Sequence, residues 1–291
     1  MREFKDRVAV VTGAASGIGF AMAERFARER MKVVLADIHP DSLQQAAAEL
    51  RAAGATVLAV PTDVSDAAAM EALASKTVET FGAVHLVCNN AGVVADRPAW
   101  EFTPADWQWI LGVNLFGVIH GIHAFVPRML AQGEEGHIVN TASAAAFVPL
   151  QGIAPYNVSK AGVVALSETL AMDLAQVGAQ IKVSVLCPGF VTTNLPATSA
   201  RNRPQQPAAA AAQMGGGPMT RLVQEARDGG LRNPLTAADV ADQVLAAVRD
   251  ERFYILPHPG YGAVLQDRTR ALLAGGYPCP VQADTLVKAN G

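Results

Sequence analysis

The chain has 291 residues, 51% of them hydrophobic and 17% charged, and its formal net charge at pH 7 is −3. This composition is too apolar for a disordered chain and is sufficient for a large core. Because no block of basic residues is present, we expect neither nucleic acid nor an anionic membrane as a partner.

Short β-branched segments alternate with longer amphipathic segments over the first 190 residues. Strands are predicted at 7–13, 32–37, 56–64, 84–92, 136–143 and 181–189, and helices at 20–30, 41–54, 67–82 and 156–178. Continuously apolar strands that are each followed by a helix indicate a parallel sheet covered on both faces. The predicted fold is therefore a doubly wound, Rossmann-type α/β domain of about seven strands, spanning residues 1–291 as a single domain.

The segment 107–127 contains no Asp, Glu, Lys or Arg and is long enough to cross a bilayer. Gln108, Asn114, His120 and His123 argue against a membrane span, as do three glycines. We expect a helix that is buried on most sides and contributes to a subunit contact.

The alternation of strands and helices ends after residue 188. Pro204, Pro207 and the glycines at 215–217 rule out one long regular element within 194–234, although the alanine run at 208–212 could form a short helix. A segment of this length is either an active-site lid or a tolerated surface insertion.

Regular structure is predicted to return near the C-terminus. A helix at 236–250, with Thr236 as its N-cap, precedes a last strand at 252–257. Residues 257–291 then form a C-terminal extension whose structure the pattern does not predict.

A glycine-rich turn, "TGAASGIG" at 12–19, joins the first strand to the first helix. Its glycines allow a sharp turn and a close approach of the backbone to a pyrophosphate, which the N-terminus of the helix attracts. The alternative is a tight turn that binds nothing. The residues expected at the phosphates are Gly13, Ser16, Gly17, Ile18 and Gly19.

Asp37 ends the second strand, 18 positions after Gly19, and is followed by Ile38. A carboxylate there can accept hydrogen bonds from the ribose hydroxyls of NAD and would repel the 2′-phosphate of NADP. NAD is therefore the expected cofactor, with NADP the less favoured alternative.

The ends of the third and fourth strands should complete the nucleotide site, because ligands bind at the carboxyl ends of parallel strands. Asp63 is expected to bond the adenine amino group, and Val64 to pack on the ring. The "NAG" triplet at the next strand end should line the ribose, through Asn90, Ala91 and Gly92.

Six motifs now appear in order: "TGAASGIG", "CNNAG", "GVNLFG", "NTASAAAF", "YNVSK" and "CPGFVTTN". Together they resemble the classical short-chain dehydrogenases/reductases, closely over about residues 5–195 and more loosely over the helix at 236–250 and the last strand. The resemblance implies a dinucleotide-dependent oxidoreductase and homo-oligomers, either dimers or tetramers. Beyond the motifs, the segment 107–130, the long lid and "FYILPHP" look most like a longer bacterial subgroup that includes oxidoreductases for bulky aromatic alcohols.

Tyr156 and Lys160 lie four residues apart on one helix face. An ammonium near a phenol favours the phenolate and should lower the pKa of Tyr156 from about 10, so that the tyrosine can act as acid and base. Ser143, 13 residues earlier, should hold the substrate oxygen near the tyrosine. The alternatives are a solvated helix pair and a helix cap.

The resemblance adds further roles to these positions. It implies that Lys160 also binds the nicotinamide ribose and that Asn114 holds a water in a proton relay, although Asn114 could merely pin a helix distortion. It also implies that the turn after the sixth strand meets the nicotinamide through Pro188, Gly189, Val191 and Thr193. The spacing of Tyr156 and Lys160 disfavours an enoyl reductase.

The residues that flank these positions are candidates for the substrate pocket. They are Val94, Ala145, Val148, Gln151, Phe190 and Leu195. All but Gln151 are apolar, and none of these positions carries an Arg or Lys for an acidic group. We therefore expect a hydrophobic secondary alcohol or ketone, over which the segment 194–234 closes.

Cysteines and histidines point to no further chemistry. The three cysteines are widely spaced without a CxxC pair, and no secretory signal is recognisable, so we expect a reduced, cytoplasmic setting. His120 and His123 share a helix face without a nearby acidic or cysteine partner, and no metal site is expected.

The preferred hypothesis is an NAD-dependent alcohol dehydrogenase or ketone reductase. An NADPH-dependent carbonyl reductase of the same family and a catalytically silent NAD-binding regulatory protein are the alternatives. The set Asn114, Ser143, Tyr156 and Lys160 speaks against a silent protein, which would not need all four.

Overall fold

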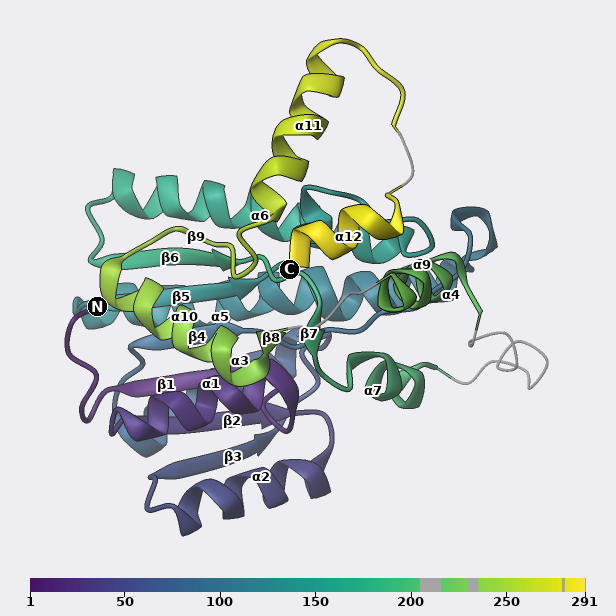
Figure 1. The fold of residues 1–291 in the computed structure, drawn as a ribbon. Helices are drawn as coiled ribbons and strands as arrows, with labels where there is room; N and C mark the ends of the chain where they lie inside the picture. Colours follow the sequence, from purple (N-terminus) through teal and green to yellow (C-terminus); the bar gives the residue numbers. More distant parts are fainter. Residues whose placement is uncertain (205–215, 230–234, 279–280, 291) are drawn as a thin grey trace.

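The computed structural model describes residues 1–204, 216–229, 235–278 and 281–290. Its centre is a seven-stranded sheet in which every pair is parallel (Figure 1). The strands, in their order across the sheet, are β3 (Val57–Pro61), β2 (Lys32–Asp37), β1 (Val8–Thr12), β4 (Leu86–Asn89), β5 (Gly136–Thr141), β6 (Ile181–Leu186) and β9 (Tyr254–Ile255). The order reverses between β1 and β4, which opens a crevice at their carboxyl ends, and the predicted doubly wound fold is confirmed.

Helices cover both faces of this sheet. One face packs against α1 (Gly17–Arg28), α2 (Pro40–Ala52) and α10 (Ala237–Asp250). The other packs against α3 (Ala67–Phe81), α5 (Gly117–Gln132) and the C-terminal half of α6 (Ala154–Gln176). Strand β1 is buried along its whole length, as expected for a strand covered on both sides.

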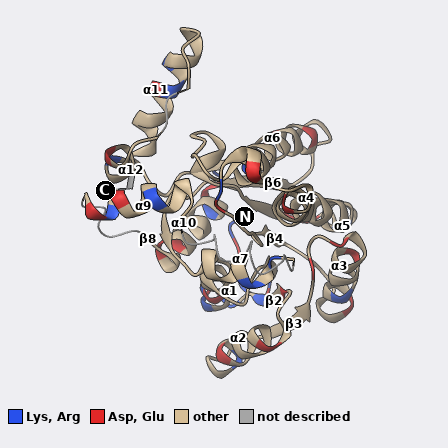
Figure 2. Cartoon of the chain, turned by 90° about the vertical axis from the view of Figure 1, so that its right-hand side faces the viewer, with Lys and Arg blue, Asp and Glu red and all other residues tan. Residues whose placement is uncertain are grey.

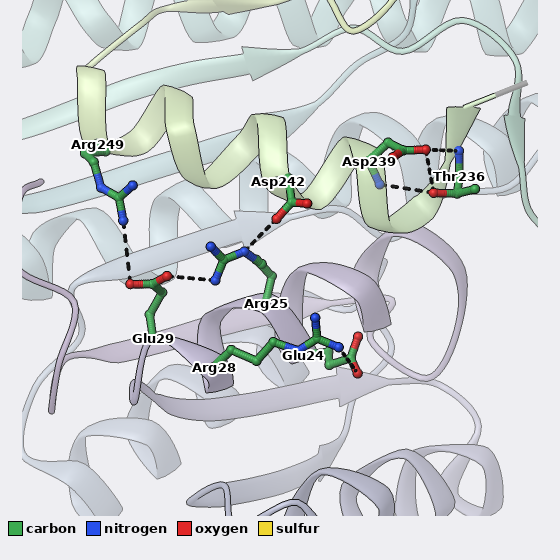
Figure 3. A network of polar contacts seen from close by, with 8 residues as sticks. All are labelled: Glu24, Arg25, Arg28, Glu29, Thr236, Asp239, Asp242 and Arg249. Atoms are coloured by element: carbon green, nitrogen blue, oxygen red, sulfur yellow. Dashed lines mark hydrogen bonds and ion pairs between the residues drawn. The ribbon is translucent and has the colours of Figure 1, made fainter.

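Helices α1 and α10 are far apart in sequence and lie side by side. Two ion pairs connect them: Arg25 Nε of α1 lies 2.6 Å from Asp242 Oδ1 of α10, and Glu29 Oε2 at the end of α1 lies 3.6 Å from Arg249 Nη2 of α10 (Figure 3). The predicted N-cap of α10 is confirmed: the Thr236 hydroxyl accepts from Asp239 N in a reciprocal capping box.

The predicted helix over 107–127 is not uniform. It consists of α4 (Pro104–Leu111), a π-helical turn (Gly112–Phe116) and α5, so that the helical path runs from Pro104 to Gln132. Among the described helices, this stretch is the one long and apolar enough to cross a membrane. Core helices meet the same criterion, and 44% of its most apolar window is buried within the protein.

The segment 194–234 is more regular than its prolines and glycines suggested. Its described parts contain α7 (Leu195–Asn202) and α9 (Pro218–Asp228), and each helix has a proline in its first turn, where no backbone N–H is needed. A two-stranded parallel sheet of β7 (Val191–Thr192) and β8 (Leu235–Thr236) flanks the segment. The alanine run at 208–212 lies outside the described residues.

The C-terminal extension adds two helices, α11 (Tyr261–Leu273) and α12 (Ala283–Asn290). Helix α11 projects away from the body in both Figure 1 and Figure 2, whereas α12 returns to pack beside α9. In the view of Figure 2, basic and acidic residues are interspersed over the helices and gather into no single basic face.

Candidate active site

A cavity of about 1350 Å³ occupies the crevice at the carboxyl ends of the strands. It brings together residues from every predicted motif, and most of the predicted site lines it. The residues from the sequence prediction that do so are Gly13, Ser16, Gly17, Ile18, Asp37, Ile38, Asp63, Val64, Asn90, Ala91, Gly92, Val94, Ser143, Ala145, Val148, Tyr156, Lys160, Pro188, Gly189, Phe190, Val191, Thr193 and Leu195. The predicted residues outside this lining are Gly19, Asn114 and Gln151.

The glycine-rich turn has the geometry that a pyrophosphate needs. Gly13 has φ +64°, and a Cβ there would lie 2.9 Å from Ala91 Cα. Helix α1 begins at Gly17 with no side-chain cap from Ser16 and no acidic residue in its first turn, so its first N–H groups face an anion site. Gly19 serves packing instead, because a Cβ there would lie 2.2 Å from the Gly13 carbonyl oxygen.

The Asp37 carboxylate is fixed at the cavity wall by two backbone groups. Its Oδ2 accepts from Ala15 N and its Oδ1 from His39 N, each at 3.1 Å. Each oxygen keeps acceptor capacity for a ribose hydroxyl. On the other side, the His39 ring contacts the Asn202 side chain, which brings the end of α7 to this part of the cavity.

The polar side chains that follow β3 and β4 line the cavity, but part of their hydrogen-bonding capacity is already used within the protein. Asp63 Oδ1 already accepts from Ser65 N at 2.9 Å and from Ser65 Oγ at 2.7 Å. Asn90 Nδ2 donates to Thr12 O at 3.0 Å, and Asn90 Oδ1 accepts from Thr141 Oγ1 at 3.3 Å. The Asn90 side chain therefore ties the ends of β1 and β5 together beneath the cavity.

Ser143, Tyr156 and Lys160 converge where the sheet meets the start of α6. Ser143 Oγ donates to Pro188 O at 3.3 Å and accepts from Ala145 N at 3.2 Å. Lys160 Nζ donates to Thr141 O at 2.7 Å and lies 5.5 Å from the centre of the Tyr156 ring. A solvated helix pair is excluded for Lys160, because only 3% of its surface is exposed.

The prediction that Lys160 lowers the pKa of Tyr156 is wrong for this structure. Burial raises the pKa of the phenol, and the hydrogen bond with Ser143 offsets this only in part. Burial likewise lowers the pKa of Lys160 to about 8. Desolvation is the largest influence on both groups, so Tyr156 is held as the neutral phenol, which is the form that donates a proton to a ketone.

Asn114 lies behind the cavity wall, fully buried in the π-helical turn. Its Oδ1 accepts from Val93 N at 2.8 Å, and its Nδ2 donates to Val93 O at 2.9 Å and to Ser159 Oγ at 3.2 Å. Ser159 Oγ donates in turn to Tyr156 O at 2.7 Å. The side chain of Asn114 thus connects the π-helical turn to the backbone of Tyr156 and has little capacity left for a water.

Gln151, which was expected in the substrate pocket, does not line the cavity. Its Nε2 donates to Val281 O at 2.9 Å, so the side chain fastens the C-terminal extension. Its Oε1 is buried without a partner among the described residues. Nothing in the sequence around Gln151 indicated this contact with a residue 130 positions away.

Helices α7 and α9, called the lid helices below, both line the cavity and are held there by polar contacts. Ser199 Oγ, on α7, accepts from Val94 N at 3.0 Å, and Arg203 forms an ion pair with the buried Asp106. Asp96 accepts from Met219 N at 3.0 Å and from Thr220 N and Oγ1 at 2.6 Å each, which caps α9. Sequence reasoning missed Asp96 and Asp106, because their partners lie about a hundred residues away.

His258 is a further residue that sequence reasoning missed. Its Nδ1 accepts from Gly189 N at 3.1 Å, and its Nε2 lies 3.0 Å from Phe190 O, to which the neutral ring donates. Burial lowers the pKa of His258 and keeps the ring neutral, against the opposing effect of the Phe190 carbonyl. The histidine fixes the same turn whose Pro188 carbonyl accepts a hydrogen bond from Ser143. Its position between two prolines in "LPHPG" is the sequence feature that could have drawn attention to it.

The two lid helices make the cavity more polar than the pocket residues predicted from the sequence suggested. Arg201 on α7 and Arg227 on α9 both line it, although none of the predicted pocket positions carried a cation. Neither side chain has a partner among the residues that the structure describes.

Cys88 and Cys187 are buried free thiols. Burial raises the pKa of Cys187 to about 12, so this cysteine is no nucleophile at neutral pH.

The chain is similar to known proteins in sequence and in fold. The family model described as short chain dehydrogenase matches residues 7–204. A 1-deoxy-11-beta-hydroxypentalenate dehydrogenase of Streptomyces exfoliatus is 38% identical over 264 residues, 90% of this chain and 86% of that one. A C alpha-dehydrogenase of a Sphingobium species is 34% identical over 274 residues, 94% of this chain and 87% of that one. A solved short chain dehydrogenase/reductase from Burkholderia phymatum, in complex with NAD, is 42% identical, with a TM-score of 0.86 over 97% of this chain and 99% of its own.

Proposed function

Because the chain belongs to the short-chain dehydrogenase family and is an oxidoreductase, we propose that it interconverts a hydrophobic secondary alcohol and its ketone with NAD(H). The observation that carries this proposal is the convergence of Ser143, Tyr156 and Lys160 in one cavity with the glycine-rich turn and Asp37. Bound nicotinamide would supply or accept the hydride.

The side chains of this site divide the remaining work. Ser143 has a hydroxyl that can bond the substrate oxygen, and it is already linked by a hydrogen bond to Tyr156. Tyr156 would donate its proton to the ketone oxygen during reduction and accept it during oxidation. Lys160, which is buried, would bond the ribose and would stabilise the phenolate that reduction leaves.

The substrate end of the cavity supports a hydrophobic compound. Val94, Ala145, Ile153, Tyr156, Leu195 and Met219 are among the side chains that pack together there. The similarity to dehydrogenases named for pentalenate and C alpha substrates supports a bulky substrate but selects none. The lid helices α7 and α9 would exclude water from the reacting atoms.

Asp37 supports NAD over NADP, as does the similarity to a protein crystallised with NAD. One observation favours the NADPH-dependent alternative: Arg201 lines the cavity next to Asn202, which contacts His39 beyond Asp37. A guanidinium in that position could bind a 2′-phosphate.

The test is the oxidation of NADH and NADPH by the purified protein with a panel of hydrophobic ketones. We expect turnover with NADH, and we expect Asp37→Ser to raise the NADPH-to-NADH ratio of kcat/KM by about tenfold or more, equivalent to ~1.4 kcal/mol. A wild-type preference for NADPH would overturn the assignment of NAD. Binding of NADH without turnover of any ketone would instead favour the silent regulatory protein.

A further inference from the structure

We infer that Arg227 on the lid helix α9 binds a carboxylate of the substrate, so that the preferred substrates are hydroxy or oxo acids whose acidic group lies far from the reacting carbon. This inference rests on the proposed function. It concerns the chemical class of the substrate and leaves the reaction unchanged.

The helical spacing directs Arg227 into the cavity. The residues of α9 that line it are Met219, Thr220, Val223, Gln224 and Arg227. At 100° per residue these positions fall within one face of about 140°, and Arg227 lies near its middle. Leu222 and Ala226, on the adjoining face, are buried against Leu286 of α12.

Arg227 has no ionic partner among the described residues, and the carboxylates of neighbouring Asp228 and of Asp96 at the start of α9 are engaged elsewhere. Asp228 accepts from Gln224 Nε2 at 2.9 Å, and Asp96 accepts from the N-terminus of α9. Asp37 and Asp63 line the cavity at its nucleotide end. The Arg227 side chain lines the cavity and is exposed to solvent, so it is accessible to a substrate, and a guanidinium can bind a carboxylate through two parallel hydrogen bonds.

The length of α9 sets the distance between the two reacting parts of the substrate. Met219 packs in the same cluster as Tyr156, at the catalytic end of the helix. Arg227 lies eight residues further along, which corresponds to about 12 Å of helix axis. The acid and the carbonyl should therefore be separated by an extended chain or a ring system, and a 2-oxo acid is too short to reach both groups.

The experiment compares oxo acids of increasing carbonyl-to-carboxylate separation with their methyl esters, as substrates for NADH-dependent reduction. A charged hydrogen bond predicts that the wild type prefers the long acids over their esters by about 10- to 100-fold in kcat/KM. The preference should reside in KM, because a remote anchor binds the ground state and the transition state alike.

Arg227→Gln should bring the acid-to-ester ratio close to one, and Arg227→Lys should retain part of the preference. The matched control is Arg221→Gln on the same helix. Arg221 contacts Gly216 O outside the cavity, so its variant should keep the wild-type ratio.

Two outcomes overturn the inference: a wild-type ratio near one at every separation, or a preference for acids that survives in Arg227→Gln. Each would leave the proposed reaction intact, since the esters would still be reduced. A failure of acids and esters alike to oxidise NADH would instead overturn the proposed function.

Discussion

At the scale of single residues, burial decides the chemistry of the site more than charge does. Tyr156 and Lys160 are close enough for the ammonium to favour a phenolate, yet burial raises the pKa of the tyrosine and lowers that of the lysine to about 8. His258 follows the same rule, because its burial keeps neutral the ring that binds both Gly189 and Phe190. Tyr156 and His258 are thus held in their uncharged forms, whereas Lys160, with a pKa of about 8, is still mostly protonated at pH 7.

We predict that His258→Ala lowers kcat by about tenfold, because the loss of two buried hydrogen bonds, ~1 kcal/mol each, loosens the turn that holds Ser143 and lines the cavity. His258→Asn should recover part of kcat, since its amide oxygen can accept from Gly189 N. Steady-state kinetics, with the concentrations of NADH and of the ketone each varied, measures kcat for these variants.

Exposed His123 provides the control, and His123→Ala should retain wild-type kinetics. A purely structural histidine would give a different pattern: a lower melting temperature with unchanged kcat in the folded fraction. That pattern, or equal kcat values for the Ala and Asn variants, would contradict the positioning role of His258.

The motifs could be predicted from sequence because each depends on neighbours within a few positions. The residues at the strand ends and the Tyr156–Lys160 pair are of this kind. Of the catalytic and cofactor-binding residues predicted from the motifs, all except Asn114 and Gly19 line one cavity. Gln151 and His258 could not be assigned, because their partners lie 130 and about 69 positions away in the chain.

At the scale of helices and strands, the lid is held by side chains from outside it. The seven strands of the sheet could be predicted from their apolar patterns, but β7 and β8 have two residues each and carry no periodicity. Helix α9 was missed for a related reason: its N-terminus is capped by Asp96, which precedes it by more than 120 positions. Proline and glycine, which usually end regular structure, here begin a helix.

We predict that Asp96→Ala detaches the start of α9 and raises KM for the substrate more than it lowers kcat. Loss of a cap costs roughly 1 kcal/mol, which corresponds to about fivefold faster amide exchange over residues 218–228. Hydrogen–deuterium exchange with mass spectrometry measures this. Asp96→Asn, which keeps one acceptor oxygen, should give an intermediate rate, and unchanged exchange in the Ala variant would contradict the capping role.

At the scale of the whole molecule, two long helices present apolar side chains to solvent. Phe116 and Leu130 are 49% and 42% exposed, and Val158 and Met172 are 50% and 64% exposed. Within each pair the residues are 14 positions apart, close to four helical turns, and so lie along one side of their helix. We propose that these stripes pack across a two-fold axis in a homodimer or homotetramer.

We predict that light scattering gives a mass that is a whole multiple, greater than one, of the 30.4 kDa chain. Met172→Glu should shift the assembly toward smaller species, because the charge would be desolvated in the interface. The control is Leu273→Glu on the projecting helix α11, which should leave the assembly intact. Leu273 is 79% exposed. Dissociation by Leu273→Glu and not by Met172→Glu would place the interface on α11 and contradict the proposal.

The central claim, that Tyr156 supplies the proton while hydride passes between nicotinamide and a carbonyl carbon, is tested most directly by isotope transfer. NADH deuterated at the reactive position of its nicotinamide is incubated with a hydrophobic ketone and either the wild type or Tyr156→Phe. We predict one deuterium on the alcohol carbon of the wild-type product, and transfer slowed roughly 10²- to 10⁴-fold in the variant with NADH still bound. A product without deuterium, or a Tyr156→Phe variant as fast as the wild type, would contradict this mechanism.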